Sequence, residues 1–224
     1  MIFLRLDNYE NLHETFPVVV FLTLAGGFQD AYSYIMRGKV FANAQTGNIV
    51  LLFKNIVDLN LSEIIKYIIP LLAFMLGVHI AVRYENFHSY SNMKWRQMIL
   101  LFEIIFMISV AFIPSKLDNM ANAILSFVCA MQVYSFKKIY GLTFATTMCI
   151  GNLRSATENL SRYQITKDTK YLDASKKYYV VILIFGIGAG LGYLFSKIFK
   201  LKSILIAAIF LLISLIIMFF DNEN

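Results

Sequence analysis

Charged residues are scarce in this sequence. They make up 15% of the chain against 58% hydrophobic residues, and the mean hydropathy is +0.65. So little polar surface excludes an ordinary soluble domain, and lipid must solvate much of the chain. The net charge of +6 does not indicate nucleic-acid binding, because the basic residues stand in short clusters between apolar runs, where membrane topology accounts for them.

Sequence motifs for catalysis, metals and cofactors are also missing. The only cysteines, Cys129 and Cys149, lie in or beside apolar stretches without the spacing of a zinc or redox site, so we interpret both as packing residues. The sequence has no His-Glu-x-x-His, Gly-x-Ser-x-Gly or phosphate-loop pattern. We therefore expect no enzyme, no metal and no cofactor.

Long apolar stretches are what the sequence does contain. A membrane span needs roughly 20 apolar residues, and about six stretches approach that length, which predicts an all-α, polytopic membrane helix bundle. They are Pro17 to Met36, Ile64 to Val82, Met98 to Ile113, Met120 to Phe136, Tyr179 to Ser196 and Leu201 to Phe220. The first follows Arg5, Asp7, Glu10 and Glu14 and ends without a small-residue cleavage site, which predicts an anchor rather than a signal peptide.

Lysines and arginines set the predicted orientation. With the N-terminus inside, more of them lie on the inner side than on the outer side, and the polar segment Arg162 to Lys177 becomes a cytoplasmic loop. Both termini are therefore expected in the cytoplasm. Two further segments, Val40 to Phe53 and Leu142 to Leu160, are only semi-apolar and do not look like lipid-facing spans.

The sequence also repeats itself. We predict one domain over residues 1–224 that holds two repeats, 17–113 and 120–220, each a span, a Gly-Asn element and two further spans. The matching segments are 27–34 with 129–136, Phe41-Ala42 before Gly47-Asn48 with Phe144-Ala145 before Gly151-Asn152, 74–77 with 185–188, and 104–109 with 209–214.

Two topologies follow from this repeat. If neither Gly-Asn element crosses the membrane, each half has three spans and its copy must be inserted upside down. If both elements cross, each half has four spans and the repeats are parallel. The charge distribution favours the inverted arrangement, with each Gly-Asn element forming a half-helix or re-entrant segment.

The Gly-Asn elements are the first candidate site. Asn is a strong N-cap and Gly lets the chain turn, so Gly47-Asn48 and Gly151-Asn152 each predict a helix start. A helix that starts at membrane depth points free N–H groups and a positive dipole end at whatever lies there. The functional interpretation is two half-helices meeting at a solute site, and the alternative is interfacial turns with capping Asn. Nearby pathway candidates are Gln29, Tyr34, Asn43, Gln45 and Thr46.

Asp30 is the second candidate, because it falls inside the first span. An intramembrane carboxylate is costly unless it is paired or hydrated, so it is a functional candidate by default. The alternatives are a structural pair with Arg154 or Arg37, or a protonated acid bonded to a neighbouring helix. In the second half Gln132 replaces Asp30, so the two sites would not be electrically equivalent.

Further ionisable residues lie in or near predicted spans. Arg154 follows Asn152 and either pairs with Asp30, binds an anionic group or snorkels to the surface, with Glu158 as a local partner. Glu103 in the third span and His79 near the end of the second are candidates for a proton relay, with an interfacial position as the alternative for His79. Glycines in the fifth span predict close helix packing, at positions Gly186, Gly188, Gly190 and Gly192.

Residues 26–34 (GGFQDAYSY) and their continuation 40–50 (VFANAQTGNIV) closely resemble the YoaK family of bacterial membrane proteins, and residues 151–159 look like that family's second motif. The resemblance implies a bacterial inner-membrane protein of about six spans. It implies no substrate, because the family is largely a domain of unknown function. Cys149-Ile150 before Gly151 departs from the Thr that the family has there and that Thr46 supplies in the first half.

Our leading hypothesis is a secondary transporter or channel for a small polar solute, with Asn48 and Asn152 lining the pathway, Asp30 as the coupling or cation-selecting carboxylate, and Arg154 as its partner. The alternative is a non-transporting scaffold or accessory subunit. The expected partners are the lipid bilayer and the solute, and the sequence leaves open whether the chain forms a homo-oligomer. A water-sized cavity at Asp30 would favour transport, whereas a dry Asp30–Arg154 pair would favour a scaffold.

Overall fold

A computed structural model describes residues 16–87, 92–139, 142–143 and 146–220. In this part of the chain the fold is helical apart from one pair of two-residue antiparallel strands, which confirms the predicted all-α class. The elements are α1 (Phe16–Met36), α2 (Gln45–Val57), α3 (Leu61–Phe87), α4 (Asn92–Val110), η2 (Ser115–Leu117), α5 (Asp118–Ser135), β1 (Lys138–Ile139), β2 (Leu142–Thr143), α6 (Cys149–Thr166), α7 (Thr169–Phe199), η3 (Lys200–Ser203) and α8 (Ile204–Phe220).

Three stretches of the described residues are long and apolar enough to cross a membrane. They are Phe16–Met36, Leu61–Asn86 and Thr169–Phe220, and the last of these holds both α7 and α8. The predicted spans at 98–113 and 120–136 fall mostly in α4 and α5, which carry polar and charged residues such as Glu103, Asp118 and Gln132 and are not among these stretches. The chain therefore has the helices of a membrane protein, while six spans remain a prediction.

The predicted cytoplasmic loop at 162–177 is wrong as a description of local structure. All of it is helical except Lys167 and Asp168, where α6 turns into α7. Asp168 caps α7 by accepting a hydrogen bond from the Lys170 backbone N–H, and the Lys170 ammonium that donates to its carboxylate lowers the pKa of Asp168. The charged residues Arg5 to Glu14, which precede the predicted N-terminal anchor, lie outside the described residues.

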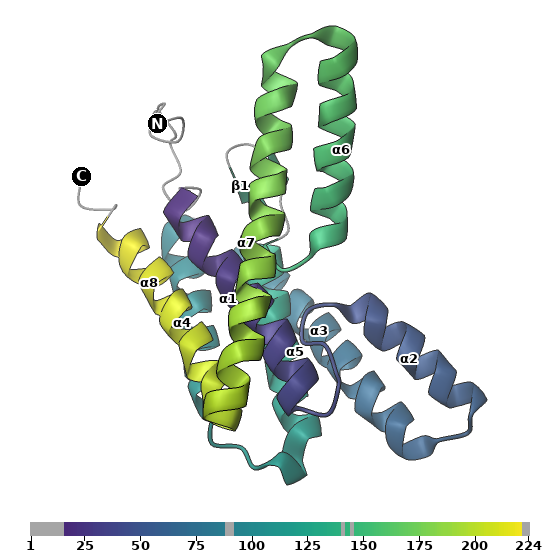
Figure 1. The fold of residues 1–224 in the computed structure, drawn as a ribbon. Helices are drawn as coiled ribbons and strands as arrows, with labels where there is room; N and C mark the ends of the chain where they lie inside the picture. The colour runs from purple at the N-terminus through teal and green to yellow at the C-terminus, as the bar shows by residue number, and fades with distance from the viewer. Residues whose placement is uncertain (1–15, 88–91, 140–141, 144–145, 221–224) are drawn as a thin grey trace.

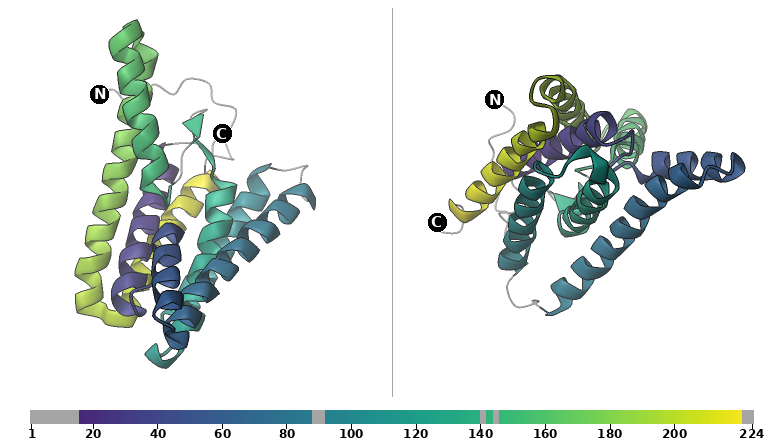
Figure 2. Two further views of the ribbon diagram at one scale, coloured as in Figure 1. Left: turned by 90° about the vertical axis from the view of Figure 1, so that its right-hand side faces the viewer. Right: turned by 90° about the horizontal axis from the view of Figure 1, so that it is seen from below.

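The helices form one bundle from which two helical hairpins diverge. Figure 1 shows α6 and the first half of α7 extending beyond one end, whereas α2 and the adjoining part of α3 diverge toward the other end. Figure 2 shows the same opposition from the side. Between them, α1 packs against α7 and α8, and α5 packs against α3 and α4. The apolar core that joins α1, α4, α5 and α8 includes Leu22, Phe28, Met107, Leu125 and Leu211.

Glycines set the two closest helix contacts. A Cβ at Gly188 of α7 would overlap the backbone of Leu24 in α1, and one at Gly77 of α3 would overlap the backbone of Phe127 in α5. Gly192 makes a further close contact with α1. The predicted packing role is therefore confirmed for Gly188 and Gly192, while Gly186 and Gly190 face open space, so for them it is wrong.

Arg37 ties the end of α1 to α4 and α5. Its side chain is fully buried, and its guanidinium donates to the carbonyl oxygens of Val110 and Ile113 and to the Asp118 carboxylate at 2.8–3.0 Å. Val110 is the last residue of α4 and Ile113 follows it, so these charge-assisted contacts hold the end of α4 against α1. Arg37 therefore has its own carboxylate partner and does not pair with Asp30, one of the alternatives that the sequence left open.

The glycine contacts predict opposite effects for one substitution at two nearby positions of α7. Gly188→Ala must push α1 and α7 apart, and we expect it to lower the free energy of unfolding by about 1–3 kcal/mol. Gly190→Ala meets no atom within 4 Å, so it should be neutral or should stabilise by up to about 1 kcal/mol through helix propensity. Thermal unfolding of the two purified variants in detergent measures this, and equal Tm values would contradict the packing.

Candidate functional site

The chain after α1 doubles back along that helix into the centre of the bundle. Gly38 and Lys39 reverse its direction with positive φ angles of 79° and 63°. The returning segment then forms hydrogen bonds to successive turns of α1: Ala42 N–H donates to Ser33 Oγ (3.0 Å) and Asn43 N–H donates to Asp30 Oδ1 (2.7 Å). The Asn43 side chain reaches one turn deeper and donates to the Gly26 carbonyl (2.8 Å). As a result, α2 starts beside the middle of α1.

Asn48 holds this loop in place but does not cap α2 as predicted. The helix begins at Gln45, and its capping residue Ala44 offers no side-chain bond. Asn48 lies one turn inside and is fully buried. Its Oδ1 accepts the Phe41 N–H (3.0 Å), while its Nδ2 donates to the Phe41 carbonyl (2.7 Å) and to Gln45 Oε1 (2.9 Å). The Asn48 amide therefore satisfies both the N–H and the carbonyl of Phe41, which lies outside any helix.

The loop before α6 meets the same turn of α1. An added Cβ at Gly26 would lie 3.0 Å from Thr147 Cγ2 and 3.1 Å from the Thr146 carbonyl oxygen. The start of α6 follows at Cys149, with Asn152 buried and Gly151 exposed on its first turn. Phe144 and Ala145, predicted as repeat partners of Phe41 and Ala42, lie outside the described residues. Both Gly-Asn elements thus follow loops that converge on Gly26.

Polar side chains gather where these loops meet α1, and they form what we call the central polar cluster: Thr23, Gln29, Asp30, Asn43, Glu103, Gln132 and Thr146. Asp30 is 7% exposed and Glu103 is 1% exposed. Gln29 Nε2 donates to Glu103 Oε1 at 2.9 Å, and Gln132 Nε2 lies 3.4 Å from Thr146 Oγ1. Buried oxygens left without a hydrogen-bond partner in the cluster include Thr23 Oγ1, Gln29 Oε1 and Asn43 Oδ1. Such atoms need water or a ligand.

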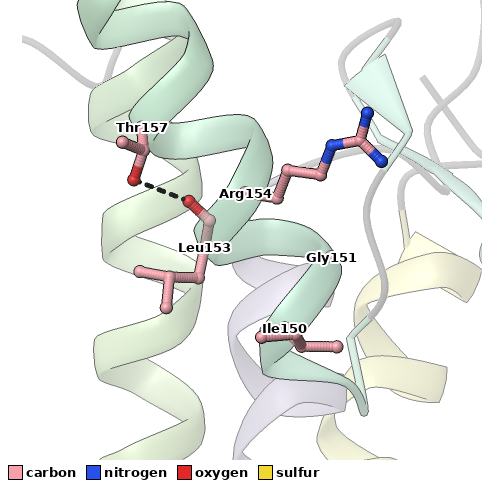
Figure 3. Close-up of a pocket in the computed structure, with 5 residues that line it drawn as sticks. All are labelled: Ile150, Gly151, Leu153, Arg154 and Thr157. Carbon is pink, nitrogen blue, oxygen red and sulfur yellow. Dashed lines mark hydrogen bonds between the residues drawn. The ribbon is translucent and has the colours of Figure 1, made fainter.

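Arg154 lies outside this cluster. Its side chain is exposed and points away from α6 on the opposite side from Thr157 (Figure 3), and no described residue forms an ion pair with Asp30. The predicted Asp30–Arg154 pair is therefore absent, because the helical turn places Arg154 on the outer face of α6. Glu158 pairs with Arg162 (2.7 Å) instead of Arg154. An open cavity of about 520 Å³ at the start of α6 is lined by Ile150, Gly151, Leu153, Arg154 and Thr157.

The remaining predicted residues divide between the cluster and the surface. Gln45 bridges the loop to α5 by donating to the Ala42 carbonyl (2.8 Å) and to Ser126 Oγ (3.3 Å). Tyr34 is 39% exposed and stacks on Phe41, and Gly47 packs under the same ring. Thr46 and His79 are exposed and take no part in the cluster, so the structure does not bring His79 to Glu103.

Sequence reasoning missed Thr146, Thr147 and Ser126. Ser126 donates to the Ala42 carbonyl (3.1 Å), and the two threonines pack on Gly26. A signal was available for the threonines, because the repeat alignment that matches Phe41-Ala42 with Phe144-Ala145 also places Thr146 opposite Asn43. No comparable signal identified Ser126, whose partner lies 84 residues away.

The role of Asn48 predicts a large cost for its removal. Asn48→Ala leaves the Phe41 N–H and carbonyl without partners beside an apolar bundle, so we expect it to reduce the free energy of unfolding by about 2 kcal/mol or more. Asn159→Ala is the matched control, because Asn159 donates only to the Ser155 carbonyl on the half-buried side of α6. Thermal unfolding in detergent compares the two, and an Asn48→Ala protein as stable as the control would refute the bracing role.

Comparison with known proteins identifies the family and no function. Neither a curated protein nor a solved structure matches the chain. A family model described as "Protein of unknown function (DUF1275)" matches residues 18–217. The YoaK proteins, which the motifs around Gly26 and Gly151 resemble, belong to this family, so that prediction is confirmed. The chain, whose described residues include three stretches long and apolar enough to cross a membrane, belongs to the DUF1275 family.

Proposed function

We propose that this chain is a secondary transporter or channel that moves a small polar solute between the starts of α2 and α6. The observation that carries the proposal is the convergence of two interrupted, polar chain segments on Gly26, in the middle of an apolar bundle. Irregular backbone at membrane depth is tolerated only where protein or a water-filled cavity surrounds it. Helices that begin there direct free N–H groups at a solute.

An inverted repeat supports this proposal. In order along the chain, α1 to α4 of the first half correspond to α5 to α8 of the second. The packing of α1 on α7 then corresponds to that of α5 on α3, and the packing of α2 on α3 corresponds to that of α6 on α7. Gly77 and Gly188, which the sequence repeat aligns, each make a close contact with the first helix of the other half. The two half-helices leave the centre toward opposite ends (Figure 1). Six spans, α1, α3, α4, α5, α7 and α8, with α2 and α6 re-entrant, agree with this symmetry.

The polarity of the site favours a small polar solute. The side-chain oxygens of Thr23, Gln29 and Asn43 are buried without a hydrogen-bond partner, and Asp30 Oδ1 accepts the Asn43 N–H. A small molecule or ion that offers donors to these oxygens would replace the hydrogen bonds that they lack. Asp30 adds one negative charge, so we propose it as the residue that selects or couples a cation. No pair with Arg154 is part of this proposal.

The exposed faces of the two half-helices differ, and this indicates from which side water enters. On α2 the exposed residues Val50 (64%), Phe53 (61%) and Val57 (82%) suit lipid. On α6 the exposed residues include Arg154, Thr157 and Ser161, which suit water. The α6–α7 hairpin also carries Lys167, Lys170, Lys176 and Lys177, as a cytoplasmic segment would. We propose that α6 lines an aqueous entrance on the cytoplasmic side.

Cysteine labelling tests this entrance. In a background with Cys129→Ala and Cys149→Ser, a membrane-impermeant maleimide should label Thr157→Cys from the cytoplasmic side. Val50→Cys should react at least about tenfold more slowly than Thr157→Cys, because hydrocarbon suppresses the reactive thiolate. Lys170→Cys, at the hairpin tip, is the positive control. Equal labelling of the Val50 and Thr157 variants would overturn the assignment of α2 to lipid and α6 to water.

Solute flux tests the function itself. Purified protein in liposomes should carry one or more members of a panel of small cations, anions and amino acids. Asp30→Asn retains an oxygen that can accept the Asn43 and Ala44 N–H groups, so it should fold, yet loss of its charge should cut flux about tenfold or more. Asp58→Asn makes the same change at an exposed pair with Lys54 and should leave flux unchanged.

The result that removes the transport proposal is equally definite. It is an absence of flux across the whole panel by folded protein, together with full activity of Asp30→Asn in cells that depend on the gene. In that case the contacts of Asp30 with the loop would be purely structural, and the chain would be a membrane scaffold or accessory subunit.

A further inference from the structure

Glu103 is a second buried carboxyl group, and no cation in the described part of the chain pairs with it. It projects from α4 between α1 and α5 and is 1% exposed. Gln29 Nε2 donates to its Oε1 at 2.9 Å, and the end of the Gln132 side chain lies 2.8 and 3.0 Å from its two oxygens. Among the described residues, no Lys, Arg or His lies within ion-pair distance of it.

The Gln132 amide fits its site in two orientations that differ by half a turn. With its nitrogen toward Glu103, it donates to both carboxylate oxygens. With its oxygen toward Glu103, its nitrogen lies 3.5 Å from the Leu22 carbonyl oxygen and 3.4 Å from Thr146 Oγ1. An ionised carboxylate is only an acceptor, so it requires the first orientation. The second orientation requires a proton on Glu103, whose O–H then donates to the Gln132 oxygen.

We propose that Glu103 reversibly binds a proton and that the Gln132 amide turns over with it. Protonation of Glu103 on α4 thereby changes the contact of Gln132 with Thr146 in the loop before α6. On binding, the carboxylate takes one proton from water, an O–H bond forms, and the Gln132 nitrogen leaves Glu103 for Thr146. On release the proton returns to water and the nitrogen turns back to the carboxylate. Coupling of this proton to solute movement rests on the proposed function, whereas the proton site itself does not.

The groups around Glu103 agree with a proton as its balancing charge. On α1 the facing groups are Gln29 and Asp30, and on α5 they are Cys129 and Gln132. The part of α8 that packs on α4, within residues 204–220, contains no titratable residue. Arg37, the one buried arginine among the described residues, pairs with Asp118. A buried carboxylate without a cation is costly, and binding a proton removes that cost.

The two carboxyl groups therefore divide their roles by environment. Asp30 Oδ1 accepts the backbone N–H groups of Asn43 (2.7 Å) and Ala44 (3.4 Å), which favour its charged form at the start of α2. Glu103 receives only side-chain amides, one of which can turn to serve either charge state.

Infrared spectroscopy of the full chain in phosphatidylcholine vesicles tests this proton site. A protonated carboxyl group has a carbonyl stretch of its own, separate from that of a carboxylate. At neutral pH we expect such a band, lost in Glu103→Gln and kept in Asp30→Asn. In Gln132→Met the band should remain but move to higher frequency, because the acid O–H loses its acceptor.

Two outcomes overturn the inference. If Glu103→Gln removes no carboxylic-acid band at any pH of a titration, Glu103 does not bind the proton. If Gln132→Met leaves the frequency of the band unchanged, the Gln132 amide does not accept the Glu103 O–H and does not turn with the proton. The second variant keeps the test informative where Glu103→Gln fails to fold. A band that behaves as expected in a protein without solute flux would establish the proton site and reject the transport proposal, so the two failures are distinguishable.

Discussion

The structure depends on how a non-helical backbone is satisfied in the centre of an apolar bundle. Unpaired N–H and carbonyl groups cannot face lipid, so the loop that leads into α2 must find its partners within the protein. It finds them at two successive turns of α1, at Ser33 and Asp30, and across the bundle at Ser126, while the Asn43 side chain adds a bond to the Gly26 carbonyl. These contacts fix the depth at which α2 begins. Asp30 thus has a structural task in addition to any role in transport.

The two halves meet this constraint with different chemistry. In the first half a carboxylate, Asp30, accepts from the loop backbone, whereas in the second half the neutral Gln132 approaches Thr146 at a longer distance. Glu103 has no acidic counterpart either, since its repeat partner is the buried Ala208. The centre is therefore charged from one side only. In the inverted repeat that we propose, the site can in this way bind one ion or proton instead of two.

Composition and periodicity were sufficient to predict the helical class, the two Gly-Asn elements and the burial of Asp30 and Glu103, because these follow from local sequence. The partners of those groups were not predictable in the same way. Gln29 and Glu103 are separated by 74 residues, so only the tertiary packing of α1 on α4 shows that they meet. The helix start at Gln45 and the outward direction of Arg154 depend on where the loops enter the bundle. For that reason the predicted cap at Asn48 and the predicted pair with Asp30 were both wrong.

The close glycine contacts also decide which parts of a transporter with this fold can move. They join α1 to α7 and α3 to α5, so the tightest packing connects the two repeats. A rocking motion of one repeat against the other would have to break both contacts. Separation of α1 and α8 from α4 and α5 would divide the apolar core that these four helices share. Gln29 of α1 bonds Glu103 of α4 within this packing, so loss or gain of a proton acts between these two helices.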